Sequence, residues 1–431
     1  MTAEIAVLNK SAVALAADSA VTIGAGSDAK IYNSVNKIFE LATETPIGVM
    51  IYNRLDYMGL PFETVIKEFR RLHGSERYDT VRACRNRFVE FLNSSVSYGE
   101  QQTADNIFFV LSTQLTAFRA ETRQEMIRLA IQKGRVLPSK RNGFLSSILT
   151  REINRLQALP FANGYAGNRL SRFTSQIVDS LIDEFFAGDN INQSCRRKLQ
   201  TYCREAIKRS ALSSARTGLV FAGFGNSELC PTVDAIEIDG ILEGQLKLVD
   251  HTHVDVTRGN VEAAILGFAQ DDMVQSFVNG VDPDFRDFVD TLIDENTEFI
   301  FEETASVLGL DKATIAAAKE ALSSTFHKLR LKFREDADQY VTRSYSQPIE
   351  DMVRHMPKRE LATLAESLIE ITSLKRKVTR ERETVGGEVD VAIVSKSEGF
   401  VWTRRKHYFP ADLNPRFFAK YTRKVESVSN A

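Results

Sequence analysis

The chain is poor in cysteine, has no long apolar run and carries almost no excess charge. Its 431 residues include four cysteines without a CxxC pair and six scattered histidines, so we expect reduced thiols, no zinc or other metal, and no cofactor. No segment reaches the roughly 18 to 20 consecutive apolar residues that cross a bilayer, and no basic region followed by a long apolar segment opens the chain. These features predict a cytoplasmic protein without membrane contact.

The balance of charge also argues against a polyanionic partner. A formal net charge of −2 gives no global attraction to nucleic acid or acidic lipid. Basic residues gather at 133–141, 196–209 and 402–421. We interpret the first two clusters as solvated faces or a subunit contact, and the third as an edge strand with a tail that meets a neighbouring subunit. Nucleic-acid binding by these clusters is the weakest of three hypotheses, and salt would have to weaken it.

Thr2 stands directly behind Met1. Because threonine is small enough for Met1 to be removed, the mature chain would begin with a free α-amino group beside a hydroxyl. A hydroxyl attacks poorly until a base takes its proton, and an N-terminal threonine supplies that base from its own amine. Threonine is common after an initiator methionine, so this position alone decides nothing.

The residues that follow Thr2 form short apolar runs. Runs at 4–8 and 12–17 flank a polar turn at 9–11 and predict a hairpin whose second strand ends at Asp18 and Ser19. Lys37 opens a third run, 38–41, and a fourth run covers 47–52 after the breaker Pro46. The chain therefore begins with four predicted strands.

This order resembles the proteasome β-subunit group of N-terminal nucleophile hydrolases, which includes bacterial ATP-dependent peptidase subunits. The matching features are the threonine, a strand, a turn, a strand ending Ala-Ala-Asp-Ser, a loop, and a lysine at a strand start. The resemblance implies an α+β fold, a four-layer αββα sandwich. It also implies that Thr2 attacks, that Lys37 lowers the barrier to its deprotonation, and that Asp18 orients Lys37. The resemblance also implies a homo-oligomer, commonly a ring. Whether an ATPase or another regulatory partner binds is left open.

The remainder of the chain alternates between the resembling domain and helical insertions. Amphipathic patterns at 62–72 and 78–92 predict two helices, and strand patterns return at 218–225, 233–238 and 262–270. The predicted parts are 1–96, the first part of the domain; 97–216, a helical insertion; 217–281, the second part; 282–350, a second helical insertion; and 351–431, a final helix, a closing strand pair and a tail.

Further site residues are implied by the same resemblance. The family places a Gly-Ser-Gly-Ser motif where this chain has Gly267-Phe268-Ala269-Gln270, so the Gln270 amide takes over a hydrogen-bonding role. Later the family has an acidic residue, a serine and Gly-Gly, and the glycines here are Gly386 and Gly387, which alternatively only admit a tight backbone path. The supporting residues are Ser19, Asn53 as the oxyanion donor, Gln270, Glu383, Thr384, Gly386 and Gly387.

Two functions follow from this pattern. The first is a threonine-type N-terminal nucleophile hydrolase, a peptidase or amidase that acts through an acyl-enzyme on Thr2 once Met1 is removed. The alternative is a catalytically inactive proteasome-like assembly or scaffold protein. The missing serine motif and the large insertions favour the alternative, whereas Thr2, Asp18 and Lys37 together favour the hydrolase.

Overall fold

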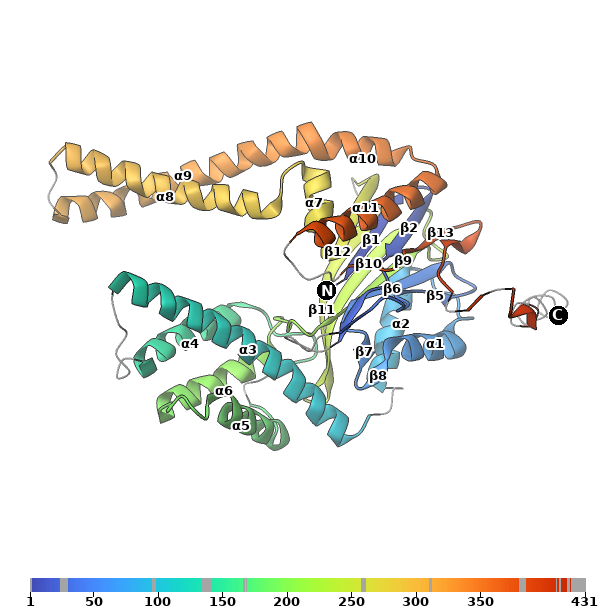
Figure 1. Cartoon of the computed structure of the whole chain (residues 1–431), viewed down its shortest axis with the longest axis horizontal. Helices are drawn as coiled ribbons and strands as arrows, with labels where there is room; N and C mark the ends of the chain where they lie inside the picture. Colours follow the sequence, from blue (N-terminus) through green and yellow to red (C-terminus); the bar gives the residue numbers. More distant parts are fainter. Residues whose placement is uncertain are drawn as a thin grey trace. The chain divides into compact units, whose positions relative to one another are not determined.

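The computed structural model describes most of the chain, and Figure 1 shows its ribbon. The described residues are 2–23, 30–94, 98–133, 141–165, 167, 169–256, 261–309, 312–379, 385–407, 409–410, 412–416 and 419. They fall into two compact units. Unit 1 comprises Met1–Val35, Gly259–Ile393 and Val401–Ala431, and unit 2 comprises Asn36–Arg258 and Val394–Phe400.

Strands and helices alternate in blocks along the chain. The strands are β1 (Ala3–Asn9), β2 (Ala12–Ala17), β3 (Val21–Ile23), β4 (Lys30–Tyr32), β5 (Ile38–Ala42), β6 (Ile47–Asn53), β7 (Asp56–Tyr57), β8 (Leu60–Pro61), β9 (Thr217–Gly223), β10 (Thr232–Leu242), β11 (Gln245–Asp255), β12 (Ala263–Ala269), β13 (Asp390–Ser395) and β14 (Gly399–Arg404). The helices are α1 (Phe62–His73), α2 (Val81–Ser94), α3 (Glu100–Lys133), α4 (Arg141–Ala158), α5 (Arg172–Phe186), α6 (Gln193–Lys208), α7 (Asp272–Asn279), α8 (Pro283–Val307), α9 (Lys312–Val341), the π-helical η3 (Thr342–Ser346), α10 (Gln347–Arg354) and α11 (Lys358–Val378).

Unit 1 is built on a five-stranded sheet in the order β12-β1-β2-β13-β14. The hairpin β1–β2 pairs Asn9 with Ala12, so its turn is Lys10-Ser11, and β12 pairs antiparallel with the other edge of β1. Alternate residues of β1, beginning with Ala3, pack with Leu361 and Leu368 of α11 in one apolar cluster. The residues between them, which include Glu4, are buried on the opposite face of β1.

Unit 2 has its own five-stranded antiparallel sheet, in the order β11-β10-β9-β6-β5. One face carries α1 and α2, where Phe69, Phe88 and Phe221 form an edge-to-face aromatic cluster. Gly218 lies directly over the Tyr52 ring, where an added Cβ would come within 1.8 Å of ring carbon Cζ. Only glycine therefore lets β9 pass Tyr52 at this register.

Helices α3 to α6 form a bundle with an interior core of their own. Leu115, Leu181 and Leu199 are completely buried in it, and Leu242 from the end of β10 belongs to the same cluster. The N-cap of α5 is Ser171, whose hydroxyl accepts the Thr174 amide N–H, and the N-cap of α6 is Asn192. The bundle is thus both capped locally and packed internally.

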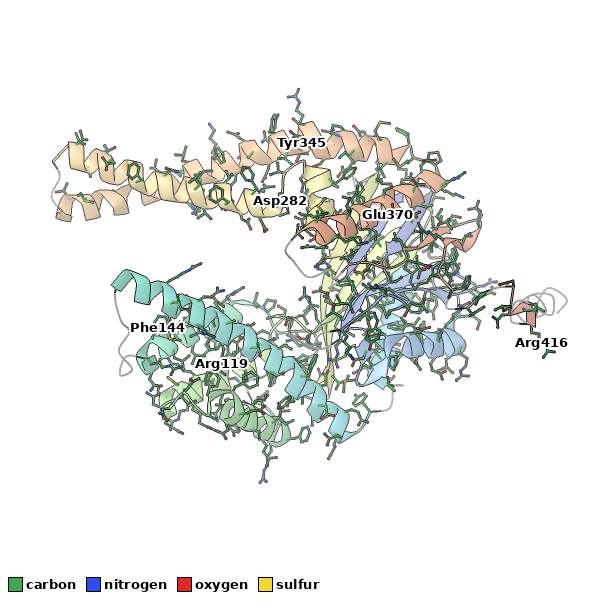
Figure 2. All side chains as sticks on the ribbon, viewed as in Figure 1. Arg119, Phe144, Asp282, Tyr345, Glu370 and Arg416 are labelled. Carbon is green, nitrogen blue, oxygen red and sulfur yellow. The ribbon has the colours of Figure 1, made fainter. Side chains whose placement is uncertain are left out.

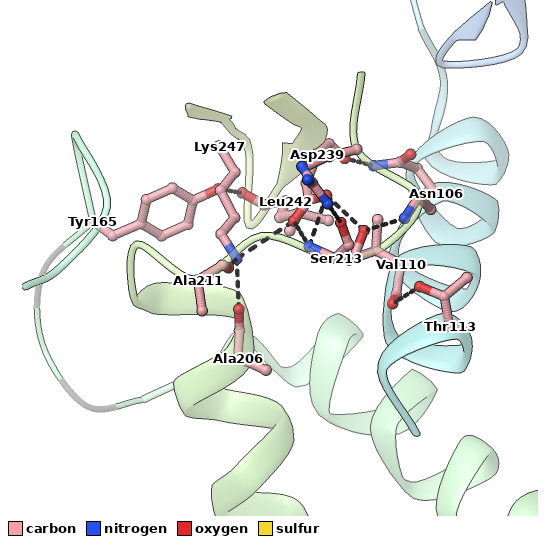
Figure 3. Close-up of polar contacts among 12 residues, drawn as sticks. Asn106, Val110, Thr113, Tyr165, Ala206, Ala211, Ser213, Asp239, Leu242 and Lys247 are labelled. Atoms are coloured by element: carbon pink, nitrogen blue, oxygen red, sulfur yellow. Dashed lines mark hydrogen bonds and ion pairs between the residues drawn. The ribbon is translucent and has the colours of Figure 1, made fainter. Parts of the chain in front are cut away.

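A buried polar cluster, drawn in Figure 3, ties this bundle to the sheet of unit 2. The Lys247 ammonium of β11 donates to the carbonyl oxygens of Ala206 (2.6 Å) and Ala211, and lies 3.5 Å from a carboxylate oxygen of Asp239. Asp239 also accepts the Ser213 hydroxyl at 2.7 Å. Burial lowers the pKa of Lys247, and the Asp239 carboxylate opposes that shift. Because each charged group has a hydrogen-bonding partner, the cluster stabilises the attachment of the bundle to the sheet of unit 2.

Helices α8 and α9 of unit 1 pair as a long antiparallel hairpin, which we call the arm. Figure 2 labels Asp282 and Tyr345 where the arm joins α7 and η3. At that base Gly280 caps α7 with φ of +67°, and an added Cβ would lie 2.3 Å from the Tyr345 ring. The Lys375 ammonium of α11 holds the same region through carboxylates of Asp272 (2.9 Å) and Asp282 (3.3 Å).

The structure confirms the α+β class and most predicted elements. Predicted strands at the N-terminus, at 218–225 and at 262–270 correspond to β1, β2, β5, β6, β9 and β12, and the predicted helices at 62–72 and 78–92 correspond to α1 and α2. The prediction that β10 ends before Asp239 was wrong, because the strand continues through a bulge to Leu242 and pairs with β11, which was not predicted. The four-layer αββα arrangement and the five-part domain division stay predictions.

Candidate functional site

The backbone around Thr2 is fixed by strand pairing. Thr2 directly precedes β1, and its carbonyl oxygen accepts the backbone N–H of Gln270 at 3.1 Å, just beyond the Ala3–Ala269 pair. Ala269 turns the chain there with φ of +61°. The Thr2 side chain is 1% exposed. The sheet therefore orders the N-terminal end of the chain as far as residue 2.

Asp18 binds three backbone amides around this end of the sheet. Its Oδ1 accepts the Ala3 N–H at 3.1 Å, and its Oδ2 accepts those of Ala20 at 3.1 Å and Gly386 at 3.0 Å. The Asp18 N–H in turn donates to the Ala3 carbonyl at 3.2 Å. One buried carboxylate thus ties the start of β1 to the end of β2 and to a segment 368 residues away.

The predicted Gly386-Gly387 landmark lies beside Asp18. The Gly386 carbonyl accepts the Ser19 N–H at 3.1 Å. Gly387 has φ of +78°, and an added Cβ would stand 2.9 Å from the carbonyl oxygen of Asn33 and 3.2 Å from the Ser19 Cβ. The glycine pair therefore admits a tight backbone path and hydrogen-bonds the Asp18 segment, and its role in a catalytic site stays a prediction.

Glu4 is the site residue that the sequence prediction missed. The Thr2 hydroxyl donates to the Glu4 carboxylate, with 3.1 Å between Oγ1 and Oε2, and Glu4 is completely buried. Successive side chains of a strand point to opposite faces, so residues 2 and 4 share a face. A signal for Glu4 was available, namely a single carboxylate two positions after Thr2 within an otherwise apolar strand.

Two of the predicted supporting residues act through the backbone or on other groups. The Ser19 hydroxyl donates to the Glu388 carbonyl and its own carbonyl accepts the Val35 N–H, so this serine braces the surrounding loops. Gln270 contributes its main-chain N–H to the Thr2 carbonyl, and the predicted role of its side-chain amide stays a prediction. Both residues support the backbone around Thr2.

Lys37 and Asn53 belong to unit 2. Lys37 directly precedes β5, is 1% exposed, and accepts the Ile51 N–H on its carbonyl at 2.9 Å. Asn53 ends β6 opposite Thr217 and has φ of +63°, a left-handed conformation in which asparagine is common. Their roles at Thr2 stay predictions. Glu383 and Thr384, like Met1, lie outside the described residues.

Other chemistry is sparse in the part of the chain that the structure describes. There, no group of three or more histidine, cysteine or acidic side chains could hold a metal ion. All four cysteines are buried and free of disulfides. No described helix is both long enough and apolar enough to cross a membrane. The hydroxyl–carboxylate pair of Thr2 and Glu4, next to Asp18, is therefore taken as the candidate site.

Comparisons with known proteins leave the family open. No family model matches the chain, and no curated protein sequence matches it. A solved structure titled Anbu, from Hyphomicrobium sp. strain MC1, shares 9% sequence identity over 99% of this chain and 97% of its own, with a TM-score of 0.29. That score is too low for the likeness to carry an argument.

Proposed function

We propose that this protein is a threonine-type N-terminal nucleophile hydrolase that cleaves a peptide or another amide. The observation that carries the proposal is the environment of Thr2. Its backbone is held by Gln270, its hydroxyl donates to Glu4 at 3.1 Å, and Asp18 binds the next amide, that of Ala3. A nucleophile must be held in one orientation beside a group that takes its proton. These contacts support the first condition, and the free amine of Thr2 would meet the second.

The reaction proceeds through an ester on Thr2. The hydroxyl oxygen attacks the amide carbonyl carbon, and its proton passes to the free amine of the same residue. When the tetrahedral intermediate collapses, the leaving amine takes that proton and the acyl group stays on Thr2. Water then attacks the ester and gives its proton to the Thr2 amine, which returns it to the threonine oxygen as the carboxylic acid leaves.

Charged groups assist this transfer. Glu4 orients the hydroxyl before attack, since its carboxylate accepts the hydroxyl hydrogen bond. In line with the resemblance, the Lys37 ammonium would favour the alkoxide form of Thr2 and Asp18 would orient that ammonium. The backbone N–H near Asn53 would stabilise the oxyanion of the tetrahedral intermediate.

The first test is the identity of the mature N-terminus. Mass spectrometry of protein purified without an N-terminal tag is expected to show a chain that begins at Thr2. A chain that retains Met1 has no free amine on Thr2, so that result would contradict the hydrolase and favour the inactive assembly protein.

The second test is a pair of substitutions at the nucleophile. Thr2→Ala should abolish hydrolysis of peptide amides and labelling by a peptide epoxyketone, because both need the hydroxyl. Thr2→Ser keeps a hydroxyl and an amine and should retain both, while thermal unfolding checks that each variant is folded. Glu4→Gln should lower kcat less than Glu4→Ala, since glutamine still accepts the hydroxyl hydrogen bond.

A further inference from the structure

The α8 helix of the arm exposes a row of large apolar side chains. Phe285, Phe288, Leu292 and Phe299 have exposed fractions between 42% and 59%. Their spacing of three, four and seven residues places them along one stripe of the helix. Ala305 is the one buried side chain among those described in α8 and α9.

A matching stripe lies on α9. Leu329, Phe333 and Tyr340 follow each other by four and seven residues and are exposed by 58%, 45% and 64%. Leu331, at 49%, falls on the other side of the same helix, because two residues correspond to a rotation of about 200°. Residues 331–336 and 338–340 are all exposed, so the stripe is defined by its apolar side chains and not by its exposure.

Ion pairs set the register between the two helices. Arg286 pairs with Asp338, and four residues further along α8 Asp290 pairs with Arg334 at 2.7 Å. This antiparallel register brings Phe285 level with Tyr340, and Leu292 level with Phe333. On each helix, about the same rotation around the helix axis separates the ion-paired residues from the apolar stripe. Because the helices are antiparallel, both stripes lie on one side of the seam between them. The arm thus has a single broad apolar face.

The charges of the two helices differ in sign. The α8 sequence holds eight acidic residues against Arg286 alone, a net charge of −7, whereas α9 holds six basic residues against four acidic ones, a net charge of +2. Four of the basic residues cluster in the segment Lys328, Arg330, Lys332 and Arg334. An α8 helix is therefore repelled by another α8 and attracted by an α9.

We propose that the arm docks face to face on the arm of a second copy of this chain and completes an antiparallel four-helix bundle. A face that contains both helices is complementary to itself, as a two-fold interface requires. A two-fold axis parallel to the helices sets each α8 against the α9 of the partner, which the charges favour, and keeps Phe285 level with the partner's Tyr340. Burial of the aromatic rows then drives the association.

A single introduced cysteine tests the contact in the full chain. The four native cysteines are buried, so Leu292→Cys supplies an accessible thiol on the apolar face. A short bismaleimide is expected to join two chains into a covalent dimer. Adding Phe288→Gln and Leu329→Gln should abolish that dimer, whereas adding Leu331→Gln, on the other side of α9, should leave it unchanged. Absence of a cross-link, or a cross-link that survives both face substitutions, would overturn the proposal.

Charge reversal tests the orientation of the pair. Lys332→Glu makes α9 less basic without touching the apolar stripe, and it should raise the dimer dissociation constant, measured by sedimentation, by about tenfold. Higher salt should also raise the dissociation constant of the wild-type dimer. A dimer that is unchanged or tighter in Lys332→Glu would exclude the pairing of α8 with α9. If the arm variants and the wild-type chain sediment identically, arm pairing is excluded altogether.

Discussion

The two helical regions of this protein differ in how far their apolar side chains are buried. In the bundle of α3 to α6, leucines such as Leu115, Leu181 and Leu199 lie in an interior core that also includes Leu242 of β10. In the arm, the aromatic side chains that the structure describes are exposed: Phe285, Phe288, Phe299, Phe333 and Tyr340. Four helices can enclose a core, whereas two helices cover each other on one side only.

The attachments of the two regions differ as well. The bundle is joined to the sheet of unit 2 by the buried Lys247–Asp239 cluster, whereas the arm is held at its base by the Gly280–Tyr345 contact and by part-exposed ion pairs of Lys375. Substitutions in the bundle should therefore cost folding stability, and those on the arm should affect association. The following predictions test that contrast.

The largest effect is expected for Lys247→Met. It leaves the Asp239 carboxylate and the carbonyls of Ala206 and Ala211 without their shared cation, and breaking a buried ion pair costs on the order of 4 kcal/mol. Urea unfolding should show this loss. As a control, Lys10→Met removes an exposed ion pair with Glu262 and should cost below about 1 kcal/mol. Equal losses of unfolding free energy in the two variants would show that the Lys247 cluster does not stabilise the attachment of the bundle.

Leu199→Ala comes next. The side chain is fully buried in the bundle core, so its truncation leaves a cavity and should lower the free energy of unfolding by about 3 kcal/mol. Circular dichroism during urea titration would measure it. A loss near zero would mean that the bundle lacks the close packing that sets it apart from the arm.

Gly280→Ala should cost about 1 to 2 kcal/mol. Alanine is strained at φ of +67°, and its Cβ would press on the Tyr345 ring at the base of the arm. Gly309→Ala is the matched control, because Gly309 has φ of +64° but nothing within 4 Å of an added Cβ. The difference between the two thermal unfolding midpoints isolates the Tyr345 contact, and identical midpoints would show that this contact does not anchor the arm.

The smallest effect on folding is expected for Leu329→Ala. In dilute solution the exposed side chain should contribute less than about 0.5 kcal/mol. At high protein concentration the wild type should gain thermal stability from association, and this variant should gain less. A large loss in dilute solution would indicate that the stripe packs within its own chain, contrary to the contrast drawn above.

Features with local causes could be predicted from the sequence. The β1–β2 hairpin follows from two apolar runs around a polar turn, and α1 follows from its amphipathic pattern, so their predictions are confirmed. Strand β11 escaped prediction because it pairs only with β10 and its side chains are largely half-buried or exposed. Its sequence therefore lacks the apolar run or alternation that marks a strand.

The candidate site likewise has features with local causes and features that depend on tertiary contacts. The sequence by itself determined that Thr2, Asp18 and Lys37 stand at the starts and ends of short strands, since those positions depend on neighbouring residues. Tertiary structure alone decided that Asp18 accepts the Gly386 N–H across 368 residues, and that the Thr2 carbonyl accepts the Gln270 N–H. Such contacts arise from strand pairing and burial between distant segments, which no local pattern encodes.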